Sequence, residues 1–331
     1  MMKLILIFFY SLPCFSLDFN RVDDQIMMTT DDCSVGENYL QQIVNWSTTL
    51  DANLELTSCV PRNINGKCET NITQCLPERV RDIHGVEPLG KGPNCWNLVL
   101  WLNNMTPNLR WTSADEMTHF MSSSLCRPLG PNESRLPGDI IAIKSNTPDK
   151  ENGGVITEEY HGMIYISEDL VFSKDSLSNH DEYSITLADD IYNEYYVESA
   201  RCRQNNNDVN CFESADFFRC DLGLKIDDVI QSTSPKIREA LDALDHYESC
   251  VEESKFSGGF LNDETSSLVD NVISILEDYS KDEVAEQANS NDAFILNTMR
   301  LRVSALRNSF NTVNDDRTSE RLEVLEQALY R

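Results

Sequence analysis

Hydrophobic and polar positions follow patterns along this chain that predict both helices and strands. The densest apolar run occupies residues 92–102, where a Gly-Pro turn and an asparagine precede Cys95 and a series of Trp, Leu and Val side chains. Asparagine is a favoured helix N-cap, so the run predicts a helix that begins at Cys95. Because the run is apolar on every side and too short to cross a membrane, we expect a buried core helix.

A mixed pattern follows this helix. Residues 113–124 have helical spacing and open with a Ser-x-x-Glu capping box. Residues 136–144 predict a turn and a strand. Residues 160–167 and 170–174 predict an antiparallel hairpin, because two short apolar runs are separated by so few residues. We therefore expect an α+β unit with a cysteine on its first helix and a histidine on its sheet.

The segments on either side of this unit differ from it. Residues 31–43 have helical spacing, and residues 59–75 hold three cysteines in loop-like sequence. Four stretches with helical periodicity and acidic outer faces lie near the C-terminus, at residues 234–253, 264–279, 281–310 and 317–330. We expect a helical bundle or appendage there, and a helix that packs on a protein partner is an alternative use of the same pattern.

The first residues predict export. Residues 1–16 combine Lys3, a compact apolar stretch and small residues at the −3 and −1 positions of a cleavage site after Ser16. No other run of the sequence approaches transmembrane length, so we expect no membrane insertion after signal cleavage. The expected location is secreted or periplasmic.

These patterns divide the chain into five segments. We expect a signal peptide at residues 1–16, a disulfide-containing N-terminal extension at 17–84 and an α+β domain at 85–203. A cysteine-containing linker at 204–233 then leads to an acidic helical region at 234–331.

Charge and cysteine content narrow the classes of function. The formal net charge of −28 excludes nucleic acid and anionic membrane surfaces as expected partners, since both would repel the protein. Of eleven cysteines, removal of Cys14 with the signal peptide leaves ten, and most should pair in an oxidising compartment. If Cys95 stays a free thiol, nine remain, and this odd number requires another free thiol or a bond outside the chain.

Cys95 and His161 are the candidate reactive pair. The first turn of a helix favours a thiolate, although a buried structural cysteine is the alternative interpretation of Cys95. A cysteine nucleophile needs a base, which in turn needs an orienting group. Of the five histidines, His161 alone opens a predicted strand after a flexible loop, where its ring can face a cleft.

Three motifs carry a resemblance to a known family. Residues 92–97 (Gly-Pro-Asn-Cys-Trp-Asn), 137–141 (Pro-Gly-Asp-Ile-Ile) and 161–167 (His-Gly-Met-Ile-Tyr-Ile-Ser) resemble motifs of the NlpC/P60 superfamily of papain-like cysteine hydrolases. The resemblance covers residues 85–203 and is closest to a group of exported bacterial proteins. It implies a cysteine-bearing helix packed on a small antiparallel sheet. It also implies cleavage of amide bonds in cell-wall peptides without a metal or another cofactor.

The resemblance also implies roles for individual residues. Cys95 matches the nucleophile and His161 the general base. The family usually has His, Asn or Gln about twelve residues further on, where this chain has Ser173. A serine can accept a hydrogen bond from the imidazole, Asp175 would be the better partner if the strand ended early, and Lys174 would disfavour the imidazolium. The backbone N–H of Cys95 would contribute to an oxyanion hole.

Two further expectations concern residues beside this set. Asn94 or Asn97 would either add a side-chain donor to the oxyanion hole or serve as a cap and local anchor. Cys126 and Cys202 flank the predicted domain, and we expect them to form a disulfide that pins the second helix to the end of the sheet.

The sequence therefore predicts an exported cysteine hydrolase that cleaves peptidoglycan peptides, or another peptide or amide substrate, through a Cys-His thioester mechanism. The alternative is a catalytically inactive papain-like domain that binds a cell-wall component or a protein partner. Acyl transfer on lipid or small amide substrates is a third class that related folds support.

Overall fold

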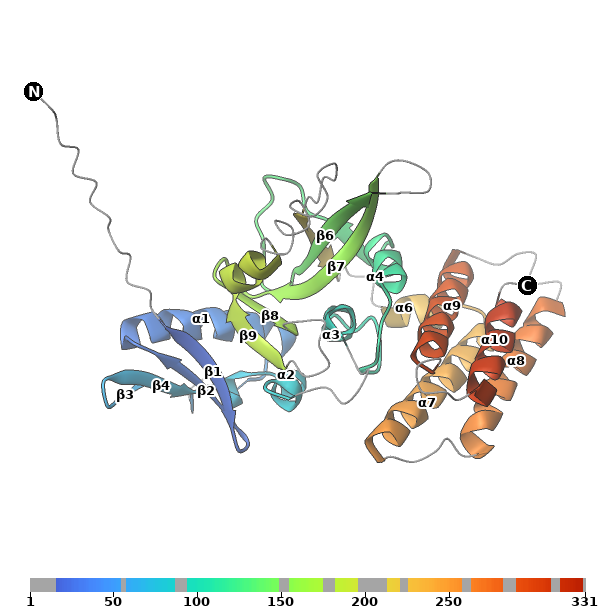
Figure 1. Ribbon diagram of the computed structural model, residues 1–331, viewed down its shortest axis with the longest axis horizontal. Coiled ribbons are helices and arrows are strands. Elements are labelled where there is room, and N and C mark those ends of the chain that lie inside the picture. The colour runs from blue at the N-terminus through green and yellow to red at the C-terminus, as the bar shows by residue number, and fades with distance from the viewer. Residues whose placement is uncertain are drawn as a thin grey trace, which may run out of the picture. The chain divides into compact units, whose positions relative to one another are not determined.

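Backbone contacts divide the chain into two units, one ending at Gly85 and the other beginning at Val86. The computed structural model describes residues 16–54, 58–86, 94–148, 155–174, 182–195, 213–220, 226–257, 263–281, 290–310 and 316–329 (Figure 1). The predicted signal peptide lies outside the described residues except for Ser16. The α+β class and the helical C-terminal region are confirmed.

The first unit packs one long helix on an antiparallel sheet. The sheet has the order β1-β2-β4-β3. Its strands are β1 (Leu17–Val22), β2 (Gln25–Thr30), β3 (Arg62–Ile64) and β4 (Lys67–Asn71). The helices are α1 (Cys33–Leu50), the short 3-10 turn η2 (Thr73–Cys75) and α2 (Glu78–Ile83). Alternate residues of β2 face the core, where Ile26 and Met28 are buried together with Trp46 of α1.

Two disulfides close the first unit. Cys33 at the start of α1 is bonded to Cys68, and Cys59 is bonded to Cys75. The interpretation of the cysteine-bearing segment as loops is wrong for Cys68, which lies on β4 opposite Thr30 of β2. The pairing of β4 with a strand some forty residues earlier is long-range, so local composition did not indicate it.

The second unit is built around a six-stranded antiparallel sheet of order β5-β10-β6-β7-β8-β9. Its strands are β5 (Cys126–Pro128), β6 (Ile140–Pro148), β7 (Val155–Tyr165), β8 (Leu170–Lys174), β9 (Tyr183–Leu187) and β10 (Glu213–Cys220). The predicted hairpin of β7 and β8 is confirmed, with Ile164 opposite Phe172. Strands β9 and β10 were not predicted, and β10 lies within the segment that the sequence analysis interpreted as a linker.

Helices cover both faces of this sheet. Helix α3 (Cys95–Leu102) lies against β7 at Gly162, and α4 (Ala114–Met121) follows it. The helical residues 188–195 pack on the other face, where Ile191 joins Met163 and Tyr165 in one buried cluster. Successive strand residues point to opposite faces, which is why Gly162 and Met163 meet different helices.

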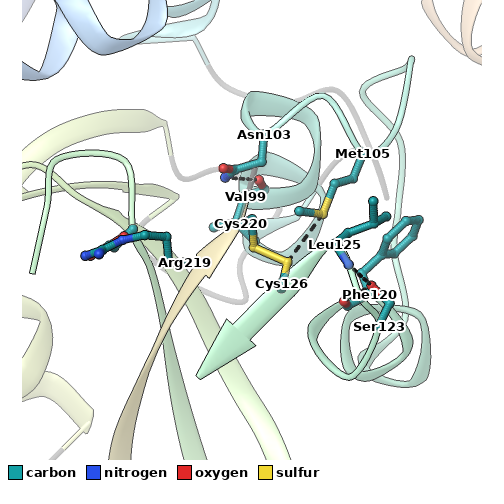
Figure 2. Close-up of a disulfide and its surroundings, with 10 residues drawn as sticks. Val99, Asn103, Met105, Phe120, Ser123, Leu125, Cys126, Arg219 and Cys220 are labelled. Atoms are coloured by element: carbon teal, nitrogen blue, oxygen red, sulfur yellow. Dashed lines mark hydrogen bonds and ion pairs between the residues drawn. A yellow bond between two sulfur atoms is a disulfide. The ribbon is translucent and has the colours of Figure 1, made fainter. Parts of the chain in front are cut away.

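The predicted disulfide between Cys126 and Cys202 is wrong for Cys126, which is bonded to Cys220 (Figure 2). The two cysteines lie directly opposite each other on β5 and β10, with their Cα atoms 4.1 Å apart. The pairing of strands far apart in sequence decides this bond, and spacing along the chain does not reveal it. Cys202 lies outside the described residues.

The disulfide packs behind the helix that bears Cys95. The Cys126 sulfur lies 4.0 Å from the sulfur of Met105, just beyond the end of α3 (Figure 2). Because Cys126 has no S–H in the disulfide, this is a packing contact and not a hydrogen bond. The disulfide therefore joins the edge strand β5 to β10 next to the C-terminal end of α3.

The Pro137-Gly-Asp turn before β6 has a structural role. Gly138 has a φ of 97°, in the left-handed region that glycine occupies without a Cβ penalty. Asp139 accepts a hydrogen bond from the Leu136 N–H at 2.7 Å and forms a two-point ion pair with Arg219 of β10. These contacts hold the turn and the start of β6 in place.

The C-terminal helices pack against each other and against the sheet-bearing part of the second unit. They are α6 (Ile226–Gln231), α7 (Pro235–Ser257), α8 (Asp263–Lys281), α9 (Ser290–Phe310) and α10 (Asp316–Leu329). His119 of α4 stacks on Phe294 of α9 with ring centroids 4.5 Å apart. The His119 Nε2 atom also lies 3.0 Å from Thr298 Oγ1. Helix α9 therefore shares an interface with α4.

Candidate functional site

Cys95 is the first residue of α3, as predicted. The Asn94 side chain caps the helix by accepting a hydrogen bond from the Asn97 N–H at 3.1 Å. Cys95 is buried, and among the described residues it and Cys250 are the cysteines that are not in a disulfide. Its thiol thus stands at the positive end of the helix dipole, beside free N–H groups of the first turn.

Both asparagines of this turn are used as local anchors. The Asn94 Nδ2 atom donates to the Thr112 carbonyl at 2.7 Å. The Asn97 Nδ2 atom donates to Thr112 Oγ1 at 3.1 Å, while its Oδ1 accepts from the Arg110 N–H at 2.9 Å. These bonds tie the first turn of α3 to the loop that precedes α4, which is the anchoring role and not the oxyanion role.

Gly162 lets α3 approach the strand that carries His161. A Cβ atom at this position would lie 2.8 Å from Cε3 of Trp96 and 3.4 Å from Cγ2 of Val99. Glycine is therefore required where the cysteine helix crosses β7. The approach also brings the Gly162 N–H within hydrogen-bonding reach of the Cys95 sulfur.

His161 and Ser173 are in direct contact. The His161 Nε2 atom lies 2.9 Å from Ser173 Oγ, and both side chains are buried. The contact spans β7 and β8 beyond their last paired residues, Ile164 and Phe172. The Tyr195 ring packs on the imidazole with centroids 4.9 Å apart, so its ring plane is fixed from a second side.

Burial controls the charge of both candidate reactive groups. Desolvation lowers the pKa of His161 from 6.5 to about 3, and the charge of Lys174 acts in the same direction. Burial raises the pKa of the Cys95 thiol, although hydrogen bonding from Gly162 and the charge of Lys174 oppose this rise. At neutral pH the site therefore holds a neutral thiol and a neutral imidazole.

The predicted site residues are brought together in two groups. His161 and Ser173 form one group, and Cys95 reaches the backbone of Gly162, the next residue after His161. Across the residues that the structure describes, no hydrogen bond joins Cys95 to His161. Asp175, the alternative orienting residue, lies outside those residues.

Sequence reasoning missed two features that support the site. The role of Gly162 could have been inferred from the sequence, because a glycine directly after a candidate base on a buried strand indicates that another backbone approaches the strand closely there. The other feature is the buried ion pair of Arg110 with Glu116 and Glu248. Nothing local in the sequence distinguishes Glu248 from the exposed acidic residues of its helix.

The described residues include neither a metal-binding cluster nor a membrane-spanning helix. Within the described ranges, no cluster of three or more His, Cys, Asp and Glu side chains could hold a metal ion. None of the helices described combines the length and apolar composition needed to cross a bilayer. The disulfides of both units are typical of an oxidising compartment.

Comparison of the chain with protein-family models, with curated proteins and with solved structures gives no match.

Proposed function

We propose that the chain is an exported cysteine hydrolase with a papain-like NlpC/P60 fold, which cleaves amide bonds in peptidoglycan peptides. The observation that carries this proposal is the 2.9 Å contact between His161 Nε2 and Ser173 Oγ, on the strand that α3 crosses at Cys95. His161 faces the side of β7 that packs on Tyr195, whereas the Cys95 sulfur reaches the Gly162 backbone on the α3 side. Nucleophilic catalysis therefore requires the imidazole to turn towards the thiol. A secreted or periplasmic location fits both the disulfides and the predicted signal peptide.

In the proposed mechanism each imidazole nitrogen has its own role. With Nε2–H donating to the Ser173 hydroxyl oxygen, Nδ1 is left as the basic atom. In the reaction the imidazole turns to the α3 side of β7, and the thiol proton passes to Nδ1 as the Cys95 sulfur attacks the substrate carbonyl carbon. Backbone N–H groups at the start of α3 stabilise the oxyanion of the tetrahedral intermediate.

The second half of the cycle returns the proton. His161 donates it to the nitrogen of the scissile amide, the C–N bond breaks, and the amine leaves while the acyl group remains on Cys95 as a thioester. Water then attacks the thioester with Nδ1 as the base. The carboxylic acid leaves and the thiol re-forms, so that one water is consumed for each amide bond cleaved.

Replacement of Cys95 tests the proposal. We expect Cys95→Ala to abolish the release of peptide fragments from purified peptidoglycan by the full chain. Cys250→Ala is the matched control, because Cys250 is the other described cysteine outside a disulfide and lies on α7. Equal fragment release by wild-type protein and Cys95→Ala would overturn the proposal.

A second function is favoured by one observation. Cys95, His161 and Ser173 are all buried, and burial shifts the thiol pKa upward and the imidazole pKa downward. Both shifts oppose a thiolate–imidazolium pair, as in an inactive domain that binds a wall component or, through its C-terminal helices, a protein partner. Reaction with iodoacetamide distinguishes the two functions. In an active site Cys95 would be alkylated at mildly acidic pH, whereas in an inactive domain it would be alkylated only under alkaline conditions.

A further inference from the structure

A cluster of buried charges joins the C-terminal helices to the loop that anchors Cys95. Its members are Arg110, Glu116, Asp245, Glu248 and Arg302. Glu248 of α7 lies at its centre. The Arg302 Nε atom donates to Glu248 Oε1 at 2.9 Å, and Glu248 Oε2 lies 3.2 Å from Arg110 Nε. The latter contact is an ion pair that is not aligned as a hydrogen bond.

The cluster depends on the charge of Glu248. Burial alone would lower the pKa of Arg110 and of Arg302, but the neighbouring carboxylates outweigh it and raise both values. Both guanidinium groups therefore stay charged, and each disfavours the charge of the other. Glu248 separates and neutralises them, so its loss would leave two like charges facing each other in the interior.

Hydrogen bonds continue from Arg110 to the turn that holds Cys95. The Arg110 N–H donates to Asn97 Oδ1 at 2.9 Å, and Arg110 Nη1 donates to Thr112 Oγ1 at 3.3 Å. Thr112 is in turn bonded to the side chain of Asn94. The residues on both sides of Cys95 and Trp96 are thus anchored to a loop whose arginine is held by α7.

We propose that the C-terminal helices set the position of Cys95, and that Glu248 is the positioning residue through which they act. Its consequence for catalysis rests on the proposed function, whereas its effect on the thiol is measurable without that function. The helical region is then an integral part of the site-bearing unit and not an independent appendage.

The rate at which iodoacetamide alkylates Cys95 in the full chain, measured by mass mapping of peptides, tests this role. Glu248→Gln keeps the shape of the side chain and removes its charge. We expect alkylation to become about tenfold faster, because local opening of the first turn exposes the buried thiol. This rate should change little with urea below the unfolding transition, whereas exposure by global unfolding would rise steeply.

Glu326→Gln is the matched control. Glu326 of α10 pairs with Arg307 of α9 at 2.7 Å, within the same helical region but outside the cluster. We expect the wild-type alkylation rate for this variant. Arg302→Lys provides a second variant if Glu248→Gln does not fold, because it keeps the buried charge and loses the two-point contact.

Asn97→Ala removes the hydrogen bond between Asn97 and the Arg110 N–H without removing a buried charge. By itself it should raise the rate at which Cys95 is alkylated. Combined with Glu248→Gln it should add little, since both changes act along one path. A folded Glu248→Gln or Arg302→Lys protein with the wild-type Cys95 rate would overturn the positioning role.

Assays of peptidoglycan cleavage on the same samples separate the two proposals. Faster alkylation in the cluster variants of a wild-type protein that cleaves nothing would support the positioning role and contradict the hydrolase. Cleavage by wild-type protein with unchanged alkylation in the variants would do the reverse.

Discussion

The Nε2 atom of His161 lies 2.9 Å from the Oγ atom of Ser173, at the point where strands β7 and β8 have stopped pairing. Strand pairing therefore does not hold the two ends together there, and the side-chain contact does. A serine in this position holds the imidazole through one neutral hydrogen bond, which is weaker than a bond to a charged partner.

Ser173→Ala should reduce turnover without abolishing it. The imidazole would lose the acceptor that fixes Nε2–H, and kcat should fall about 10- to 100-fold, less than the roughly 10²–10⁴ that a positioned general base contributes. Ser184→Ala is the control, since Ser184 lies opposite Ser173 on β9 and the substitution also removes one serine hydroxyl group. Fragment release from peptidoglycan is the measurement. Full activity of Ser173→Ala would rule out an orienting role for Ser173.

Gly162→Ala should destabilise the second unit. The new methyl group would lie 2.8 Å from the Trp96 ring and push α3 away from β7. We expect the free energy of unfolding to fall by about 1–3 kcal/mol in urea titrations. Gly130→Ala is the control, because a Cβ there meets no atom within 4 Å. If both variants were equally stable, α3 would not be in close contact with β7.

Acid should weaken the fold through His161. Its folded pKa of about 3 lies below the ordinary value of 6.5, so the unfolded chain binds the proton first as the pH falls. Stability contributed by the neutral imidazole is complete above pH 6.5 and is lost between pH 6.5 and about 3, at about 1.4 kcal/mol for each pH unit. The free energy of unfolding of His161→Gln, measured with urea at several pH values across this range, should depend less steeply on pH than that of the wild-type protein. An unchanged slope would contradict the buried, neutral state of His161.

Removal of the Cys126–Cys220 disulfide should cost more than removal of a free thiol. The bond closes a sequence separation of 94 residues, for which loop entropy predicts a loss of about 4–5 kcal/mol. The double variant Cys126→Ala, Cys220→Ala is compared with Cys250→Ala by urea unfolding under non-reducing conditions. A loss of less than about 1 kcal/mol would indicate that the denatured chain is already compact.

Features coded by neighbouring residues were predictable. Asn94 marked the start of α3 because a cap acts within one turn. The hairpin of β7 and β8 followed from two apolar runs with a short connection. Ser173 was named as the partner of His161 from the family resemblance, and the two side chains are in contact. The four long C-terminal helices were found from their periodicity.

Features that depend on distant partners were not predictable. Cys126 meets Cys220 only because β10 inserts between β5 and β6. Glu248 belongs to a helix with an acidic outer face, and only the approach of Arg110 and Arg302 makes its burial favourable. Periodicity shows which face a residue occupies, but it does not show what packs on that face.

Trapping of the covalent intermediate tests the central claim most directly. The full chain is mixed with a peptidoglycan peptide, quenched in acid and digested, and the mass of the peptide containing Cys95 is measured. The account predicts an added acyl group on Cys95 that hydroxylamine removes, and no such adduct in Cys95→Ala. Fragments released by the wild-type protein with Cys95 unmodified at every quench time, and released equally by Cys95→Ala, would contradict it.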